Sequence, residues 1–185
     1  EIDAKVGPID ILVNSAGAAK RTPAFELTEE AWHSAIDAKF FTYIHAMNAV
    51  LPLMAKRGSG VVVNVIGMGG KVATTIHIAG GAANAALMLA TAGLAQAYGP
   101  KNVRVVAVNP GLTITERLKE GIHTDARSQG ITPEEALKAA SSKMPLGRIA
   151  EPHEIADTVV YLSSSRASYV NGATLAMDGG LNSVV

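Results

Sequence analysis

The 185-residue sequence contains no cysteine, which excludes disulfide bonds, thiolate nucleophiles and cysteine-based metal sites. Charge is scarce as well, because only 17% of the residues are charged and 16 basic residues match 16 acidic ones. Such a balance provides no basic surface for a nucleic acid or an anionic membrane. The apolar runs have strand length or are broken by charge and glycine, so no membrane span is predicted. We expect no metal, no nucleic acid and no membrane as partners.

The start of the sequence, Glu1–Lys5, lacks the basic and then apolar layout of a signal peptide. A hydrophobic content of 48% is ample for a packed core, and the length favours one domain. These features predict a cytoplasmic, single-domain protein.

Short apolar, β-branched runs alternate with helical patterns along the chain. The runs that predict strands are Ile9–Val13, Val61–Ile66, Val103–Val108 and Ala173–Met177. Helical patterns run from Thr28 to about Lys56, from about Ile78 to Tyr98, from the capping box Thr132–Glu135 onward, and from Glu151 to about Leu162. This alternation predicts an α/β fold, a doubly wound, Rossmann-like parallel sheet with right-handed crossovers. The polar segment Gly121–Gly130 is bounded by glycines and shows no clear period, so it is the best candidate for a mobile segment.

Several segments, in this order, resemble the short-chain dehydrogenase/reductase family. They are Asp10–Gly17 (DILVNSAG), Val103–Gly111 (VRVVAVNPG), Gly147–Pro152 (GRIAEP), Asn171–Gly172 and Asp178–Gly180 (DGG). The resemblance covers essentially the whole chain. It implies that residues 1–185 are one incomplete domain, the carboxy-terminal portion of the fold. A βαβαβ part with the glycine-rich pyrophosphate loop would precede them, about 60–80 residues by the size of βαβ units. Without it, the strand Ile9–Val13 would become an exposed apolar edge.

The resemblance also identifies four positions at which the family carries its catalytic residues. Counted from Asn64, Gly67 stands at the serine position, Gly80 thirteen residues later at the tyrosine position, and Asn84 at the lysine position. On the preceding helix, Lys39 stands at the asparagine position. All four residues differ from the family pattern, and neither glycine has a proton to give.

Two residues are candidates for the missing chemistry. Lys39 adds an ammonium group near the position where Asn84 removes one, so it could polarise a substrate oxygen or donate a proton into a void beside Gly80. The alternative is that Lys39 reaches solvent or pairs with Asp37 or a partner subunit. The His77 imidazole titrates near neutrality and could donate a proton, or it could simply cap the helix that starts near Ile78. Ser15 and Tyr43 offer hydroxyls, but a loop role and helix packing suit them better.

The cofactor side of the family pattern is better preserved. By the resemblance, Asn14, Ala16 and Gly17 run beside the adenosine ribose, and Asn84 stands where the lysine binds the nicotinamide ribose. Pro110, Gly111 and Thr115 match the segment that holds the carboxamide. The cofactor implied is NAD or NADP.

These residues together lead to two alternative functions. The first is a nicotinamide-dependent oxidoreductase that moves hydride between the cofactor and a small carbonyl or alcohol substrate, with Lys39 or His77 as proton donor. The second is a catalytically silent relative that binds a dinucleotide or another ligand. Since family members pair their long helices, a homodimer or homotetramer is expected in either case.

Overall fold

The computed structural model describes residues 2–17 and 19–182. Its centre is a sheet of four strands in the order β1-β2-β3-β4. The strands are β1 (Ile11–Asn14), β2 (Gly60–Val65), β3 (Val103–Pro110) and β4 (Thr174–Met177). All three neighbouring pairs are parallel. The predicted parallel α/β fold is therefore confirmed, and each strand lies within two residues of its predicted bounds.

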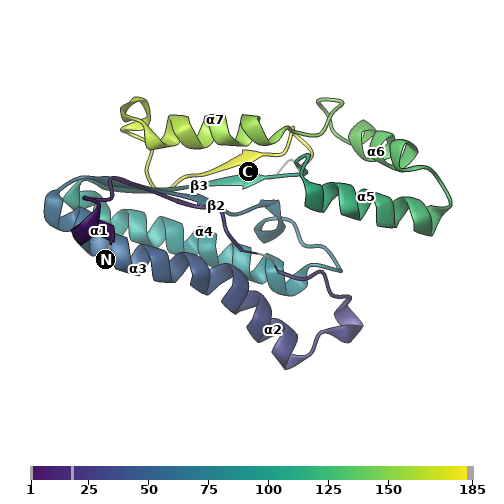
Figure 1. The fold of residues 1–185 in the computed structure, drawn as a ribbon, viewed down its shortest axis with the longest axis horizontal. Helices are drawn as coiled ribbons and strands as arrows, with labels where there is room; N and C mark the ends of the chain where they lie inside the picture. The colour runs from purple at the N-terminus through teal and green to yellow at the C-terminus, as the bar shows by residue number, and fades with distance from the viewer. Residues whose placement is uncertain (1, 18, 183–185) are drawn as a thin grey trace.

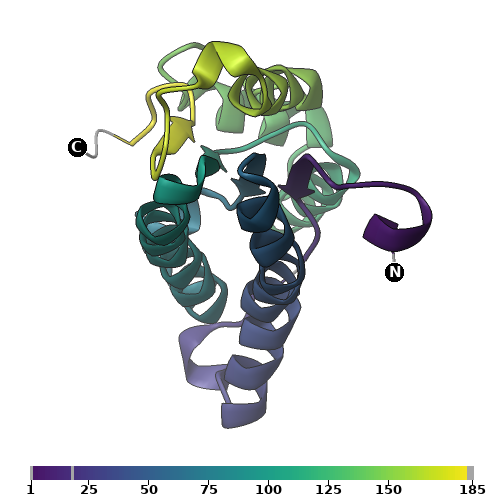
Figure 2. The same cartoon turned by 90° about the vertical axis from the view of Figure 1, so that its left-hand side faces the viewer.

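Helices cover both faces of this sheet. On one face lie α3 (Thr42–Arg57) and α4 (Ile78–Tyr98), side by side, and on the other lies α7 (Pro152–Ser163) (Figures 1 and 2). Successive residues of β3 face the helices on opposite sides of the sheet. Val105 packs in the cluster with α3 and α4, and Val106 packs in the cluster with α7. This period of two is why β3 reads as continuously apolar, because both of its faces are buried.

The helical pattern that starts after Thr28 is interrupted in the middle. The structure divides it into α2 (Glu29–Ile36), a π-helical turn η2 (Asp37–Phe41) and α3. The hydroxyl of Thr42 donates to the carbonyls of Ala38 and Lys39, at 3.4 and 3.0 Å, beside the altered hydrogen-bond ladder. Such π-helical turns occur frequently at functional sites, and this one contains Lys39.

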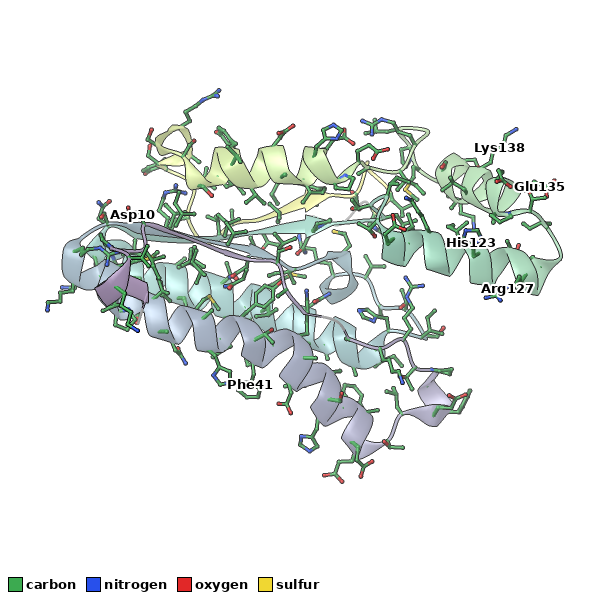
Figure 3. The ribbon with its side chains drawn as sticks, viewed as in Figure 1. Asp10, Phe41, His123, Arg127, Glu135 and Lys138 are labelled. Carbon is green, nitrogen blue, oxygen red and sulfur yellow. The ribbon has the colours of Figure 1, made fainter. Side chains whose placement is uncertain are left out.

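The segment Gly121–Gly130, in which the sequence shows no clear period, is helical as far as Gln129. It belongs to α5 (Glu116–Gln129), which packs against α6 (Pro133–Ser142) beyond the carboxyl ends of the strands. Leu118, Ile122 and Ala126 recur every four residues and form the seam with α6. The helical period was therefore present, but it lay among many polar residues. Figure 3 shows polar side chains such as His123, Arg127, Glu135 and Lys138 on this helical pair.

Helix α4 has the predicted bounds. With the following turn it is, among the described residues, the one helix long and apolar enough to cross a membrane, with a mean hydropathy of 1.5. Its buried residues Ala83, Leu87, Thr91 and Ala95 are spaced every four residues, which is the pattern of a core helix lying on a sheet. Its small residues also admit a close backbone approach, since a Cβ on Gly81 would lie 2.7 Å from the carbonyl oxygen of Gly69.

The remaining elements are short. They are α1 (Ile2–Lys5), η1 (Ala24–Glu26), η3 (Met68–Gly70), η4 (Gly99–Lys101) and η5 (Ser165–Ala167). Strand β1 lies at the edge of the described sheet, where Ile11 is 49% and Val13 is 44% exposed. The preceding βαβαβ part inferred from the resemblance stays a prediction.

Candidate active site

A cavity of about 510 Å³ lies at the carboxyl ends of the strands. Its walls come from the loops after β1, β2, β3 and β4, from the π-helical turn and from the start of α4. Ligands of doubly wound sheets bind at this end of the strands. Of the residues predicted from the sequence, those that line the cavity are Gly17, Lys39, Gly67, His77, Asn84, Pro110 and Gly111, and those that do not are Asn14, Ala16, Gly80 and Thr115.

The void predicted beside Gly80 does not exist, because the imidazole of His77 fills it. A Cβ on Gly80 would lie 2.2 Å from Cε1 and 2.6 Å from Nε2 of His77. His77 occupies the N-cap position of α4, as one alternative proposed, but its side chain makes no capping hydrogen bond. The ring instead folds back over the first turn and faces the cavity, and its Nδ1 is buried.

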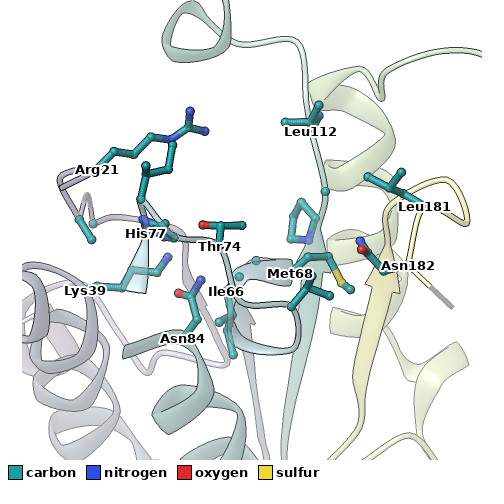
Figure 4. A pocket seen from close by; sticks show the side chains of 18 residues that line it. Arg21, Lys39, Ile66, Met68, Thr74, His77, Asn84, Leu112, Leu181 and Asn182 are labelled. Atoms are coloured by element: carbon teal, nitrogen blue, oxygen red, sulfur yellow. The ribbon is translucent and has the colours of Figure 1, made fainter. Parts of the chain in front are cut away.

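Lys39 lines the same cavity as His77, but its ammonium group is held by another residue and does not fill the predicted void (Figure 4). Its ammonium group donates a 3.4 Å hydrogen bond to the hydroxyl of Tyr43 and lies 5.0 Å from the centroid of that ring. The Tyr43 hydroxyl in turn donates to the carbonyl of Val65, at 2.5 Å. This relay ties the ammonium to the end of β2. Burial raises the pKa of Tyr43 to about 12, so the phenol stays protonated throughout the neutral range.

Asn84 is 5% exposed, and its Oδ1 has no hydrogen-bond partner among the described residues. A buried carbonyl oxygen without a donor costs about 1–3 kcal/mol, so the position favours a ligand that donates a hydrogen bond. Gly67, opposite Asn84 Nδ2, has φ 121° and ψ 149°, a conformation that residues with a side chain rarely adopt. The backbone N–H of Gly67 donates to Asn109 Oδ1 at 3.3 Å.

Asn14, Thr115 and Ser15 are placed differently from the cavity residues. The side chain of Asn14 donates to Asn64 Oδ1 at 2.8 Å, and Asn64 donates to Thr91 Oγ1 at 3.0 Å, which joins β1, β2 and α4 in the core. Thr115 is exposed and caps α5 by accepting the N–H of Leu118 at 3.3 Å. Ser15 is exposed and does not line the cavity, in keeping with the loop role expected of it.

The sequence did not single out the other residues that line the cavity, and five of these have larger side chains that reach its walls. They are Arg21, Met68, Leu112, Leu181 and Asn182. A buried carboxylate positions the last two: Asp178 accepts hydrogen bonds from the backbone N–H groups of Gly180 and Asn182 and from the Asn182 side chain, at 3.1, 3.0 and 2.9 Å. Burial alone would raise the pKa of Asp178, but these hydrogen bonds outweigh it and hold the pKa below its usual value. The Asp178-Gly-Gly turn was a usable signal, whereas nothing in the spacing singled out Arg21.

The cavity residues fit the nicotinamide cofactor that the resemblance implies. Asn84 Oδ1 is a buried acceptor that suits a ribose hydroxyl. The hydroxyl would donate to the amide oxygen, whereas a lysine at this position would donate to the hydroxyl. Pro110 and Gly111 line the cavity at the end of β3. A Cβ on Gly111 would lie 2.8 Å from Asp178 Cβ, so only glycine lets the last loop close against this wall. No group of three or more metal-binding side chains occurs among the described residues.

Comparisons with known proteins agree with this arrangement. Residues 1–182 match the protein family described as enoyl-(acyl carrier protein) reductase. The 3-oxoacyl-[acyl-carrier-protein] reductase FabG of Chlamydia muridarum is 33% identical over 181 residues, which are 96% of this chain and 67% of that protein. L-xylulose reductase of Mus musculus is 34% identical over 176 residues, which are 95% of this chain and 68% of that protein.

The structure of L-sorbose reductase from Gluconobacter frateurii, complexed with NADPH and L-sorbose, superposes with a TM-score of 0.92 at 26% identity. The match covers 100% of this chain and 70% of that one. The chain belongs to the short-chain dehydrogenase/reductase family of NAD(P)-dependent oxidoreductases.

Proposed function

We propose that the cavity is the active site of an NAD(P)-dependent oxidoreductase that interconverts a carbonyl and an alcohol with a replaced set of catalytic residues. The observation that carries the proposal is that Lys39, His77 and Asn84, from three parts of the chain, line one cavity with Pro110 and Gly111. Hydride exchange with the substrate carbon is the chemistry that the nicotinamide supplies when bound. Asn84, Pro110 and Gly111 would hold it.

In this proposal His77 does the work of the absent tyrosine. Its imidazole stands over Gly80, in the space where a side chain from that position would start. In the reducing direction, Nε2 would donate a proton to the carbonyl oxygen, and in the oxidising direction it would accept the proton of the alcohol. Imidazole is suited to both directions, because its ordinary pKa of about 6.5 lies near neutrality.

Lys39 would supply positive charge rather than the proton. Its ammonium is held by Tyr43, whose hydroxyl is anchored on the carbonyl of Val65. A fixed cation lowers the energy of the negative charge that develops on the substrate oxygen as hydride arrives. The glycine at position 67 leaves this task to Lys39, since no serine hydroxyl is present there.

The test is a pH profile of the intact protein, assayed with NADH and with NADPH against a panel of carbonyl compounds. In the reducing direction, kcat/KM should fall as pH rises through the His77 pKa. In the oxidising direction, kcat/KM for the alcohol should rise over the same pH range. His77→Gln should remove this pH dependence in both directions and lower kcat by about tenfold or more. The control is His45→Gln, since His45 is exposed on α3, stacks on Phe41 and does not line the cavity. If His77→Gln kept the pH dependence of kcat/KM that the parent protein shows, the role of His77 would be refuted.

The absence of the family's serine, tyrosine and lysine at positions 67, 80 and 84 favours one rival, a silent dinucleotide-binding relative. It predicts cofactor binding by calorimetry without turnover of any carbonyl or alcohol. Asn84→Ala should weaken cofactor binding in both cases, so only the turnover assay separates the two functions.

The same proposal includes a homodimer or homotetramer working in the cytoplasm. Leu89 on α4 is 77% exposed. Phe41 on the neighbouring π-helical turn and Leu53 on α3 are 40% and 37% exposed. Figure 3 shows Phe41 pointing away from the sheet. Light scattering should find a dimer or tetramer, and Leu89→Glu should shift it toward monomer, whereas Lys138→Glu on the exposed side of α6 should not. Cell fractionation tests the location.

A further inference from the structure

The charged side chains described in the wall of the cavity are both positive. Arg21 and Lys39 both line it, while no aspartate or glutamate occurs among its described lining residues. The whole chain has 16 residues of each sign, so overall composition does not explain this asymmetry. Like-signed charges in a cleft with low-dielectric walls concentrate their field there and attract ions of the opposite sign.

Arg21 stands on a loop that is anchored on both sides of it. Ala19 is 5% exposed and packs in a cluster with Ala35 and Ala79. The backbone N–H of Thr22 donates to the carbonyl of Ile76 at 2.9 Å, which joins this loop to the segment that ends in His77. The backbone of Arg21 is thereby held beside the segment that ends in His77, and its exposed side chain starts from this fixed point.

The Arg21 side chain itself extends over the mouth of the cavity (Figure 4). It forms no ion pair with any residue that the structure describes. The one buried carboxylate near the far wall, Asp178, uses its oxygens on Gly180 and Asn182. The guanidinium donors of Arg21 therefore remain available to a ligand, and their planar fork matches a carboxylate or a phosphate.

The opposite wall is mostly apolar, with the amide of Asn182 among its side chains. Figure 4 shows Leu112 and Leu181 across from Arg21, with Met68 below them. A ligand that enters thus meets a cation on one side and mostly hydrocarbon on the other. The volume of about 510 Å³ must hold the nicotinamide end of the cofactor as well as the substrate, which limits the substrate to a small molecule.

We propose that the substrate is a small carbonyl or hydroxy compound with an anionic group, a carboxylate or a phosphate, that binds Arg21 at the mouth. The reacting oxygen then lies deeper, toward His77 and Lys39. The identity of the reacting group rests on the function proposed above, whereas the contact between the anion and Arg21 does not require turnover.

Matched pairs of probes test this with the intact protein. One pair is 4-oxopentanoate and its methyl ester, and the other is dihydroxyacetone phosphate and dihydroxyacetone. Within each pair the carbonyl is constant and the charge changes. We expect kcat/KM to be about tenfold or more higher for the anion of at least one pair, the size of a charge-assisted hydrogen bond. The pair with the larger ratio tells a carboxylate from a phosphate.

Arg21→Met should bring this ratio close to one, and Arg21→Lys should keep part of it. The matched control is Lys20→Met, which removes the same charge from an exposed neighbour that does not line the cavity, and it should leave the ratio unchanged. Equilibrium binding by calorimetry, with cofactor present, gives the same comparison without turnover.

Each other outcome has a definite meaning. A ratio near one in the parent, or a ratio that Arg21→Met leaves intact, overturns the inference. So does an Arg21→Met variant with a raised KM for the cofactor alone, because the cation would then serve a cofactor phosphate. Anion-selective binding that depends on Arg21, without turnover of any carbonyl or alcohol, would sustain the inference while refuting the proposed oxidoreductase function.

Discussion

The imidazole of His77 occupies the place where a side chain on Gly80 would begin, with Cε1 only 2.2 Å from the position of a Cβ there. The two residues are three apart in the chain, and the ring folds back over the first turn of α4. Glycine at position 80 and histidine at position 77 are therefore one structural unit. The absence of a side chain at position 80 is what makes room for the imidazole.

This unit predicts a coupling that a double-mutant cycle can measure. Gly80→Ala forces the ring of His77 to move, and overpacking of this kind costs about 1–3 kcal/mol. In a His77→Ala background the same change should cost at least about 1 kcal/mol less, since contacting residues couple by about 0.5–3 kcal/mol. Chemical denaturation of the four proteins gives the coupling energy. Additive effects would show that the ring does not depend on Gly80.

Restoring the family's serine at position 67 should harm the protein. Gly67 has φ 121°, and a residue with a side chain is strained there by about 1–3 kcal/mol. We expect Gly67→Ser to lower the melting temperature and to bring no gain in turnover. Gly93→Ala is the matched control, and we expect it to raise the melting temperature. Its Cβ would meet nothing within 4 Å, and alanine in a helix is favoured over glycine by about 1 kcal/mol. A Gly67→Ser protein as stable as the parent would contradict the strain.

Removing the ammonium of Lys39 should slow the reaction while the fold is kept. We expect Lys39→Met to reduce kcat by about tenfold or more, or ~1.4 kcal/mol of transition-state stabilisation. Lys39→Arg should retain more activity than Lys39→Met, because it keeps the charge. Lys56→Met, on the exposed side of α3, should behave as the parent. Equal turnover in Lys39→Met and the parent would end the role of this cation.

The turn that carries Leu181 and Asn182 should give stability with a defined pH dependence. The pKa of Asp178 is lowered in the folded protein, so its contribution is complete above the unfolded value of about 4 and is lost as pH falls through the folded pKa. Asp178→Asn should cost about 1–3 kcal/mol at neutral pH. Its deficit should shrink below about pH 4, where the parent carboxylate also becomes neutral. Thermal melts across this range measure it, with Asp157→Asn on the exposed face of α7 as control. A deficit that is constant with pH would show that the charge of Asp178 is unimportant.

Much of the fold could be predicted from local patterns. The runs that became β2 and β3 are apolar on both faces, which identifies buried parallel strands, and the bounds of α4 follow from its length of small apolar residues between His77 and Gly99. The capping box of Thr132 and Glu135 is present as predicted, with hydrogen bonds of 3.2 and 2.8 Å. The sequence was least informative where the local signal was mixed: α5 hides its apolar seam among polar residues, and the π-helical turn at Lys39 leaves no trace in the pattern.

The amino-acid sequence by itself determined the family and the parallel sheet, because motif order and periodicity are properties of the chain; the four altered catalytic positions stay a prediction from the resemblance. Only the tertiary structure decided that His77 fills the space over Gly80, that Tyr43 holds Lys39, and that Arg21 stands over the cavity. The last two depend on which way a side chain turns once its helix or loop is packed. Arg21 shows this most clearly, since its place beside His77 comes from a hydrogen bond between Thr22 and Ile76, which are 54 residues apart in the chain. Contacts of that kind form only when the sheet and its helices bring the loops together.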